Sequence, residues 1–337
     1  MLYAFIFSFV FSVIAILFLI KFFNKKEIYQ IVRKDVMDTH SFTKKQKPTM
    51  GGIVAVVSLI LSAAIFTKFD IYVTQALIIA TFFALFGFFD DYIKIFKKNT
   101  NGFKGSIKLI LELLIVSGVI VWSAYYGLPF TSGNVFIPFN YFLKLSIFIG
   151  IFHLFLVVGS ANAVNLTDGL DGLAIIPVIT TSIGFLIIIL YPEYFSPFNG
   201  EDLSGIAVLL ASVIGSGVAF FFFNKFPAKI FMGDVGSLFY GSFLGYISVA
   251  TRYEAFYAFA GLLFIVEILS STLQVFLHFF WGKRLLKSAP LHHHFEKCGW
   301  SERKIILIFW LFQILTTILG LWLMMYRPLT NCKIDIL

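Results

Sequence analysis

The sequence predicts an all-α integral membrane protein, and three observations support this fold class. Hydrophobic residues make up 59% of the 337 residues and charged residues 13%, against about 45–50% and about 25% in soluble domains. Phenylalanine accounts for 44 residues, more than a water-facing surface carries without aggregating. The apolar stretches are long, about 17–25 residues, and lack a period of two, so we expect helices rather than barrel strands.

Ten apolar stretches are drawn as membrane spans. Neither an internal repeat nor a low-complexity linker divides them, so residues 1–337 are predicted to form a single membrane domain. The expected spans are residues 2–22, 51–67, 73–89, 109–126, 143–161, 173–190, 205–223, 236–250, 255–280 and 305–326.

Basic residues indicate the orientation. With the amino terminus outside, the inward segments hold 21 of the 26 Lys and Arg residues, and such an excess marks the cytoplasmic side. Both termini are therefore expected on the outer, extracytoplasmic face. The net charge of +8 then reflects orientation in a lipid bilayer rather than a nucleic-acid partner. On the outer side, the uncharged stretch 127–140 is expected to form a turn or hairpin.

An acidic pair follows the third expected span, in the stretch FFDDYIK (88–94). A carboxylate near hydrocarbon costs about 2.5–3.5 kcal/mol on insertion scales, and two neighbouring carboxylates repel unless a cation lies between them. Mg²⁺ is usually held by one or two carboxylates together with substrate phosphates. Asp90 and Asp91 are thus predicted to form half of a magnesium site, with the following lysines as phosphate partners. A charged helix end at headgroup level is the alternative.

A second polar cluster lies in SANAVNLTDGLDGLA (160–174). Asn162, Asn165, Asp168 and Asp171 recur every three residues, which keeps them on one side of a helical or near-helical turn. Amide and carboxylate side chains can recognise a polar group such as a base or sugar through hydrogen bonds. The absence of Lys and Arg from this segment favours recognition over a plain polar turn between spans.

A third stretch, NKFPAKIFMGDVGSL (224–238), places Phe231 three residues before Asp234. Pro227 and Gly233 break the helical pattern around the phenylalanine. Phe231 is either core packing or a stacking platform for a nucleobase beside a metal-binding aspartate. From this stretch alone, core packing is favoured.

A fourth stretch, PLHHHFEKCGW (290–300), contains three consecutive histidines. Adjacent side chains point in different directions, and Cys298 is the one further zinc ligand at suitable spacing, so a phosphate-facing or hydrogen-bonding role is favoured over zinc. In the preceding span, Glu267, Gln274 and His278 form one stripe. We expect this stripe to face the bundle interior and to make hydrogen bonds between helices.

Together these stretches resemble one family, the phospho-N-acetylmuramoyl-pentapeptide transferases of the polyprenyl-phosphate N-acetylhexosamine-1-phosphate transferase superfamily. The resemblance covers nearly the whole chain, and PTMGG and HHHFE separate this branch from the GlcNAc-phosphate branch. The matching motifs are KKQKPTMGG (44–52), FDDYIK (89–94), NAVNLTDGLDGLA (162–174), FMGDVGSL (231–238) and LHHHFE (291–296).

The resemblance implies a reaction and a location. The family transfers phospho-MurNAc-pentapeptide from UDP-MurNAc-pentapeptide to undecaprenyl phosphate and releases UMP. The chain is accordingly expected in the bacterial inner membrane, with its active site at the cytoplasmic face. The soluble nucleotide sugar and the lipid phosphate would meet at this inner interface, where all the acids of the motifs lie.

The resemblance also implies residue roles. The catalytic aspartates are Asp90, Asp91 and Asp234, which also hold Mg²⁺, chiefly through Asp234. The residues facing uridine and diphosphate are Asn162, Asn165, Asp168, Asp171, Asn224 and Phe231, with Phe231 near the uracil. The residues neutralising phosphate charge are Lys44, Lys94, Lys98, His292, His293 and His294. Where the family often has a basic residue, this chain has Ser106 between Lys104 and Lys108, so the lysine that closes the phosphate site stays undecided.

Two mechanisms and two rival functions stay open. In a single displacement, which we favour, Asp90 deprotonates the lipid phosphate, which then attacks the β-phosphorus. In the two-step alternative, Asp90 attacks first and forms a phospho-enzyme. The rival functions are a GlcNAc-1-phosphate transferase and, from another class, a lipid or solute transporter. Transporters place ionisable residues near the membrane midplane, often in repeated halves. The acids of this chain are instead expected at the inner interface, and the chain has no evident repeat. A homodimer is left open.

Overall fold

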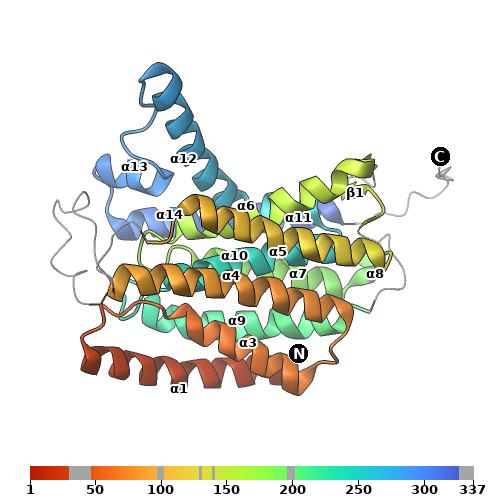
Figure 1. The fold of residues 1–337 in the computed structure, drawn as a ribbon, viewed down its shortest axis with the longest axis horizontal. Helices are drawn as coiled ribbons and strands as arrows, with labels where there is room; N and C mark the ends of the chain where they lie inside the picture. Colours follow the sequence, from red (N-terminus) through yellow and green to blue (C-terminus); the bar gives the residue numbers. More distant parts are fainter. Residues whose placement is uncertain (30–46, 97–101, 129–130, 139–140, 196–201, 326–337) are drawn as a thin grey trace.

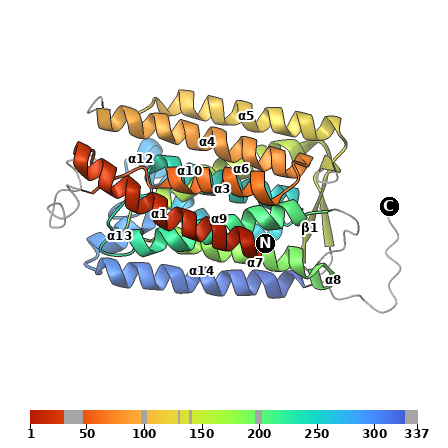
Figure 2. The ribbon, with the colours of Figure 1, turned by 90° about the horizontal axis from the view of Figure 1, so that it is seen from below.

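Long helices lying side by side dominate the computed structural model, which describes residues 1–29, 47–96, 102–128, 131–138, 141–195 and 202–325. Figure 1 shows most of these helices running along roughly one direction, with α12 steeply inclined to them, and the turned view of Figure 2 places α5 and α14 on opposite sides of the bundle. The long helices are α1 (Leu2–Lys26), α3 (Gly52–Phe66), α4 (Ile71–Phe96), α5 (Gly105–Tyr125), α6 (Ile149–Thr167), α7 (Ile175–Leu190), α9 (Ser204–Asn224), α10 (Gly233–Ala250), α12 (Leu262–Trp281) and α14 (Glu302–Met324). The shorter helices are α8 (Pro192–Phe195), α11 (Glu254–Ala260), α13 (Leu291–Lys297) and the 3₁₀ turn η4 (Ser146–Phe148).

The helices have the length and composition of membrane spans. Among the described residues, seven helices are long and apolar enough to cross a membrane, namely α1, α4, α5, α6, α9, α12 and α14. The apolar helices α3 and α7 are shorter. The chain is therefore a largely helical, polytopic membrane protein, as the composition predicts. A long helix overlaps each of the ten expected spans.

Several boundaries differ from the expected ones. Helix α4 continues to Phe96 rather than ending at residue 89, so Asp90 and Asp91 lie on a helix and not just beyond one. The expected span 255–280 is divided at Gly261 into α11 and α12. The Gly261 N–H still donates to the carbonyl of Tyr257 at 2.7 Å, as in an α-helix, and after this residue α12 projects away from the bundle in Figure 1.

A hairpin is present, but it extends past the expected stretch 127–140. Strands β1 (Asn134–Ile137) and β2 (Tyr141–Lys144) pair antiparallel, with Asn134 opposite Lys144 and Ile137 opposite Tyr141. The β2 strand uses residues that we expected at the start of a span, so α6 begins at Ile149 rather than at residue 143.

The core is centred on α9 and α10. Helix α10 packs against α4 and α6, and α9 packs against α1 and α7. Small residues allow the closest approaches, as is common between membrane helices: a Cβ on Gly52 of α3 would collide with the backbone of Gly236 in α10. This packing brings the last turns of α4 against the first turn of α10, where the motif residues gather.

A candidate active site between α4 and α10

Close backbone contact between α4 and α10 brings the three catalytic candidates together. A Cβ on Gly87, one turn before Asp90 and Asp91, would collide with the backbone of Asp234. Gly233 has φ +76°, a left-handed conformation that glycine adopts without strain, and a Cβ there would collide with Asp91 Oδ2. Glycine at these two positions therefore allows the carboxylates to meet.

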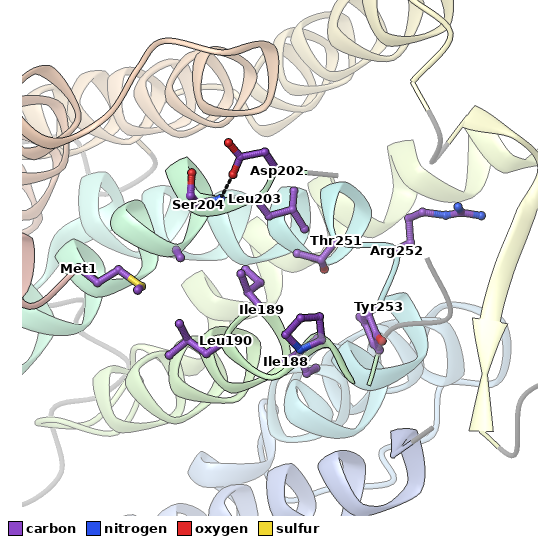
Figure 3. Close-up of a pocket in the computed structure, with 12 residues that line it drawn as sticks. Met1, Ile188, Ile189, Leu190, Asp202, Leu203, Ser204, Thr251, Arg252 and Tyr253 are labelled. Carbon is purple, nitrogen blue, oxygen red and sulfur yellow. Dashed lines mark hydrogen bonds between the residues drawn. The ribbon is translucent and has the colours of Figure 1, made fainter. Parts of the chain in front are cut away.

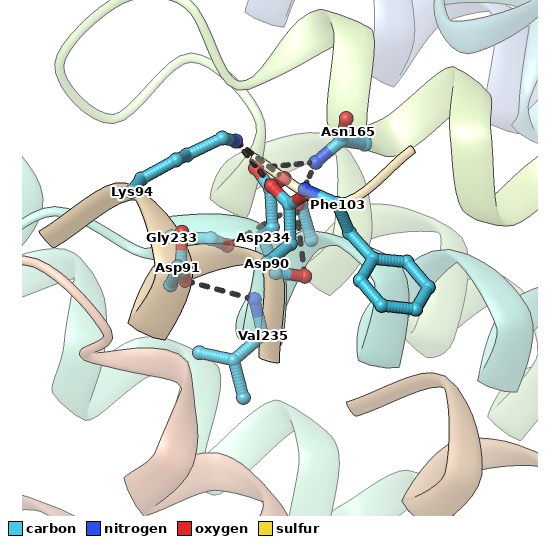
Figure 4. A network of polar contacts seen from close by, with 9 residues as sticks. Asp90, Asp91, Lys94, Phe103, Asn165, Gly233, Asp234 and Val235 are labelled. Atoms are coloured by element: carbon cyan, nitrogen blue, oxygen red, sulfur yellow. Dashed lines mark hydrogen bonds and ion pairs between the residues drawn. The ribbon is translucent and has the colours of Figure 1, made fainter. Parts of the chain in front are cut away.

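Asp90, Asp91 and Asp234 each offer an oxygen within 4.8 Å of the other two, as Figure 4 shows. Backbone and amide donors orient them. Asp90 Oδ1 accepts the N–H of Phe103 at 2.7 Å, and Asp91 Oδ2 accepts the N–H of Val235 at 3.2 Å. Taken as whole residues, Asp90 and Asp91 are 4% and 6% exposed, so the carboxylates lie largely out of water.

The side chain of Lys94 enters this cluster from one turn along α4. Its ammonium makes an ion pair with Asp90 and another with Asp234 Oδ2 at 2.8 Å. Asn165 of α6 completes the group, because its Nδ2 donates to Asp234 Oδ1 at 3.0 Å and to Ser237 Oγ at 2.8 Å. Three converging carboxylate oxygens are the hard ligands that suit Mg²⁺, so the donor set fits the predicted metal.

The four polar residues predicted to share one side are divided by the structure. Asn165 faces the carboxylates, but Asn162 donates to Glu112 of α5 at 2.8 Å. Asp168 follows the end of α6 at Thr167. Desolvation raises the pKa of the Asp168 carboxyl well above its usual range, and the nearby negative charges, Asp234 first among them, raise it further.

Asp171 is linked through Lys47 to Phe231 and does not join the carboxylate cluster. Its Oδ2 accepts the N–H of Ala228 at 2.8 Å and lies 3.4 Å from Lys47 Nζ. The Lys47 ammonium is also 5.6 Å from the centre of the Phe231 ring. A backbone hydrogen bond from Phe231 N–H to the carbonyl of Pro48, at 2.8 Å, holds the two segments together.

His292 points toward the loop that carries Asp168 and Asp171. It is fully buried, and its Nδ1 lies 3.1 Å from Glu267 Oε2. Nε2 makes no hydrogen bond within the described residues and lies where a Cβ on Gly169 would collide with it.

The remaining candidates bond elsewhere or lie outside the described residues. His293 contacts Glu296, and His294 Nδ1 accepts the N–H of Lys287 at 3.1 Å. Asn224 Nδ2 donates to the carbonyl of Ile230 at 2.9 Å and so supports the loop before Phe231. Lys44 and Lys98 lie outside the described residues.

The sequence analysis did not predict three of the residues that the structure places at or near this site. Lys47 lies within KKQKPTMGG, but Lys44 was selected from that motif. Glu112 stands in the fourth expected span, and a buried acid in an apolar helix was a usable signal. Glu267 was expected to bond between helices, and its partner proves to be His292.

A separate pocket of about 380 Å³ lies at the opposite end of α9 and α10 (Figure 3). Its lining includes Leu190 at the end of α7, Ser204 at the start of α9 and Thr251 just after α10. The charged residues in its lining are Asp202 and Arg252. None of the motif residues contributes to it.

Buried carboxylates at one end of an apolar helical bundle define a membrane protein that handles a cation or a charged substrate. The family described as glycosyl transferase family 4 matches residues 73–252, which include the carboxylates and Asn165. This match extends over more than half of the chain. The chain therefore belongs to glycosyl transferase family 4.

Curated relatives narrow the family further. The phospho-N-acetylmuramoyl-pentapeptide-transferase of Bartonella quintana (strain Toulouse) is 40% identical over 301 residues, 87% of this chain and 83% of the relative. The proteins of that name from Francisella philomiragia and Francisella tularensis (strain FSC 198) are 39% and 41% identical, each over 90% of this chain and 86% of the relative. The chain is a member of the phospho-N-acetylmuramoyl-pentapeptide-transferase family, as its motifs predict.

Proposed function

We propose that this protein transfers phospho-MurNAc-pentapeptide from UDP-MurNAc-pentapeptide to undecaprenyl phosphate, giving the lipid-linked peptidoglycan precursor and UMP. The main support is the sequence identity of about 40%, over most of the chain, with phospho-N-acetylmuramoyl-pentapeptide-transferases. The meeting of Asp90, Asp91 and Asp234 at one end of an apolar bundle supports it. A lipid phosphate and a soluble nucleotide sugar need such a site at a membrane surface.

The proposal includes the orientation and the number of spans. The ten long helices would all cross the membrane, and the end of the bundle that carries Asp234 would face the cytoplasm of a bacterial inner membrane. The excess of Lys and Arg in the segments at this end supports that orientation. With it, both termini lie outside and the hairpin β1–β2 covers the outer surface.

The nucleotide sugar would enter along Phe231 and the loop after α6. Phe231 would stack the uracil, Asp171 would bond to the nucleoside, and Lys47 would stand beside them, as the contacts of these three residues suggest. The Nε2 of His292, which has no hydrogen-bond partner in the described part of the chain, would serve the phosphate-bearing part of the substrate.

The acceptor would approach along α12. This projecting helix is mostly exposed, and it carries an apolar groove of about 480 Å³. A groove of this kind offers a surface to a prenyl chain. The groove is lined by Ser271, Thr272, Val275, Phe276, Phe279 and Phe280.

Catalysis would divide between the two neighbouring aspartates. Asp91 is tied to the α10 backbone through Val235 and so would fix the geometry of the cluster. Asp90 would remove the proton of the lipid phosphate, which then attacks the β-phosphorus and expels UMP in a single displacement. Lys94 would neutralise phosphate charge. Mg²⁺, held by the three carboxylates, would stabilise charge on the diphosphate and on the leaving UMP.

One assay tests the proposal. Purified protein in detergent is given fluorescent UDP-MurNAc-pentapeptide and undecaprenyl phosphate, and UMP and labelled lipid are measured. We expect both products in equal amounts. UDP-GlcNAc serves as the matched control donor. A preference for UDP-GlcNAc would indicate a GlcNAc-1-phosphate transferase. Substrate binding without UMP release would favour a transporter.

A further inference from the structure

Lys94 is placed between two carboxylates rather than beside one. Its ammonium makes an ion pair with Asp90 on its own helix and, at 2.8 Å, with Asp234 Oδ2 of α10. Figure 4 shows the amine end of the side chain directed into the cluster. The side chain of Lys94 is 31% exposed, against 6% for Asp90 and 21% for Asp234. The lysine therefore enters from the open side of the cluster.

The carboxylates that Lys94 contacts belong to the same set that a divalent cation would use. Asp90, Asp91 and Asp234 offer ligand atoms within 4.8 Å of one another, and Lys94 is bonded to two of these three residues. A cation held by the same carboxylates would lie within a few ångströms of the ammonium. Like charges at that distance repel strongly in a poorly solvated site, so the two cations compete for these carboxylates.

We propose that Lys94 and the divalent ion are alternative partners of Asp90 and Asp234, so that metal binding releases the Lys94 ammonium to the substrate phosphate. The inference rests on the metal site of the proposed function. A lysine suits this exchange because its charge sits at the end of a flexible four-carbon stem, and because the open side of the cluster leaves room to move.

The exchange has a thermodynamic consequence. If metal binding frees a cation for phosphate, the metal and the phosphate-bearing substrate strengthen each other's binding by the same factor. The exchange also accounts for a lysine placed one turn after an acidic pair: it balances part of the buried charge until the metal takes that role.

Lys108 of α5 provides the matched control. Its charge acts on Asp234 through space, but among the described residues it makes no ion pair with that carboxylate. Removing either lysine makes the cluster more negative, and a more negative cluster attracts any cation more strongly. Direct competition predicts a much larger effect at Lys94 than at Lys108.

The first measurement is Mn²⁺ affinity by electron paramagnetic resonance, on chelator-treated full-length protein in detergent. We expect Lys94→Met to bind Mn²⁺ at least about tenfold more tightly than the wild type, within the range of typical coupling between sites. Lys108→Met should change the affinity much less, and Lys94→Arg, which keeps the competing charge, should stay near the wild type. Equal gains in both Met variants, or no gain in Lys94→Met, would overturn the exchange.

The second measurement uses the wild type and does not depend on the folding of a variant. Lysines are labelled briefly with an amine-reactive reagent, with and without Mn²⁺, and Lys94 labelling is quantified by mass spectrometry. Mn²⁺ should increase it several-fold, while Lys225, an exposed lysine over the Phe222 ring, should not change. Unchanged Lys94 labelling at saturating Mn²⁺ would overturn the exchange.

The outcome is independent of the transferase assay. If the protein releases UMP but Lys94 shows no competition, the proposed function stands and the exchange fails. If Lys94 competes with Mn²⁺ but UMP is not released, the exchange stands and the assigned reaction fails. If neither the wild type nor Lys94→Met binds Mn²⁺, the exchange is overturned together with the metal site.

Discussion

The two ends of α10 treat buried charge in opposite ways. Beyond Ala250, Glu254 of α11 pairs with His153 of α6 at 2.9 Å, and both side chains are 2% exposed. At the other end, the carboxylates of Asp90, Asp91 and Asp234 meet beside Lys94. One end holds a buried acid that has a partner of its own, whereas the other collects more acid than Lys94 can balance.

This difference separates a structural pair from a binding site. A buried acid with its own partner can be satisfied inside the protein, and breaking the pair mainly costs stability. Several carboxylates in one place repel unless a cation joins them. The excess of acid at the start of α10 therefore indicates a ligand, and the balanced pair at its end indicates packing. Four predictions test this contrast.

Metal removal should have the largest effect on activity. We expect exhaustive EDTA treatment to abolish UMP release and Mg²⁺ or Mn²⁺ to restore it, because the proposed site depends on a divalent ion to join the three carboxylates. The measurement is UMP formation before chelation, after it and after metal is returned. Full turnover in the chelated protein would mean that the acid-rich end needs no metal.

Replacing each of the neighbouring aspartates in turn by Asn should separate the role of a general base from that of a metal ligand. Asn keeps the shape of Asp but cannot accept a proton, and loss of a general base costs about 10²–10⁴-fold in rate. Asp90→Asn should bind UDP-MurNAc-pentapeptide almost normally but turn over slowly at any Mg²⁺ concentration. Asp91→Asn should recover in part as Mg²⁺ is raised, because it removes one ligand from a site that has several.

The readout for this pair is kcat and KM across a magnesium titration, with substrate binding measured separately. Recovery of Asp90→Asn together with an inactive Asp91→Asn would reverse the two roles. Full activity in both variants would mean that the two aspartates are only a charged helix end without a catalytic role.

Phe231→Ala should have an intermediate effect that appears in KM rather than kcat. Stacking of a base on an aromatic ring contributes about 1–3 kcal/mol, which corresponds to about 5- to 150-fold in affinity. Steady-state kinetics with varied UDP-sugar measures the effect. Phe222→Ala is the control, since that exposed ring contacts Phe9, Phe221 and Lys225. An unchanged KM in the folded Phe231 variant would assign this ring to core packing.

Glu254→Gln should have the smallest effect on activity and a clear effect on stability. Disturbing a buried hydrogen bond so that a polar group loses its partner costs about 1–3 kcal/mol, so the thermal midpoint should fall while the folded variant keeps nearly wild-type kcat at low temperature. Thermal unfolding in detergent and the UMP assay measure the two quantities. A loss of kcat with an unchanged thermal midpoint would contradict the structural role of this pair, because Glu254 would then contribute to catalysis.

Local patterns allowed much of the site to be predicted. A carboxylate beside an apolar span is costly wherever the span packs, so Asp90, Asp91 and Asp234 could be selected without a fold, and the structure brings them together. The hairpin could be predicted because an uncharged, turn-rich stretch separates two spans.

Other features depended on long-range packing. Asn162 and Asp171 are nine residues apart, which is two and a half helical turns at about 3.6 residues per turn, so a continuing helix would put them on opposite sides. The chain in fact leaves the helix at Thr167. Asn162 turns to Glu112 on α5, and Asp171 meets Lys47 across 124 positions of sequence. A motif of period three could not reveal either partner.

The sequence by itself determined the membrane class, the helices and the kind of chemistry, because hydropathy and the cost of unpaired acids depend on composition and local order. Tertiary structure alone decided which charges meet. Glycines let α4 and α10 touch at the acid pair, Lys94 reaches two carboxylates from different helices, and Glu267 holds His292. These contacts depend on backbone separations of a few ångströms between segments far apart in the chain, and no local pattern specifies them.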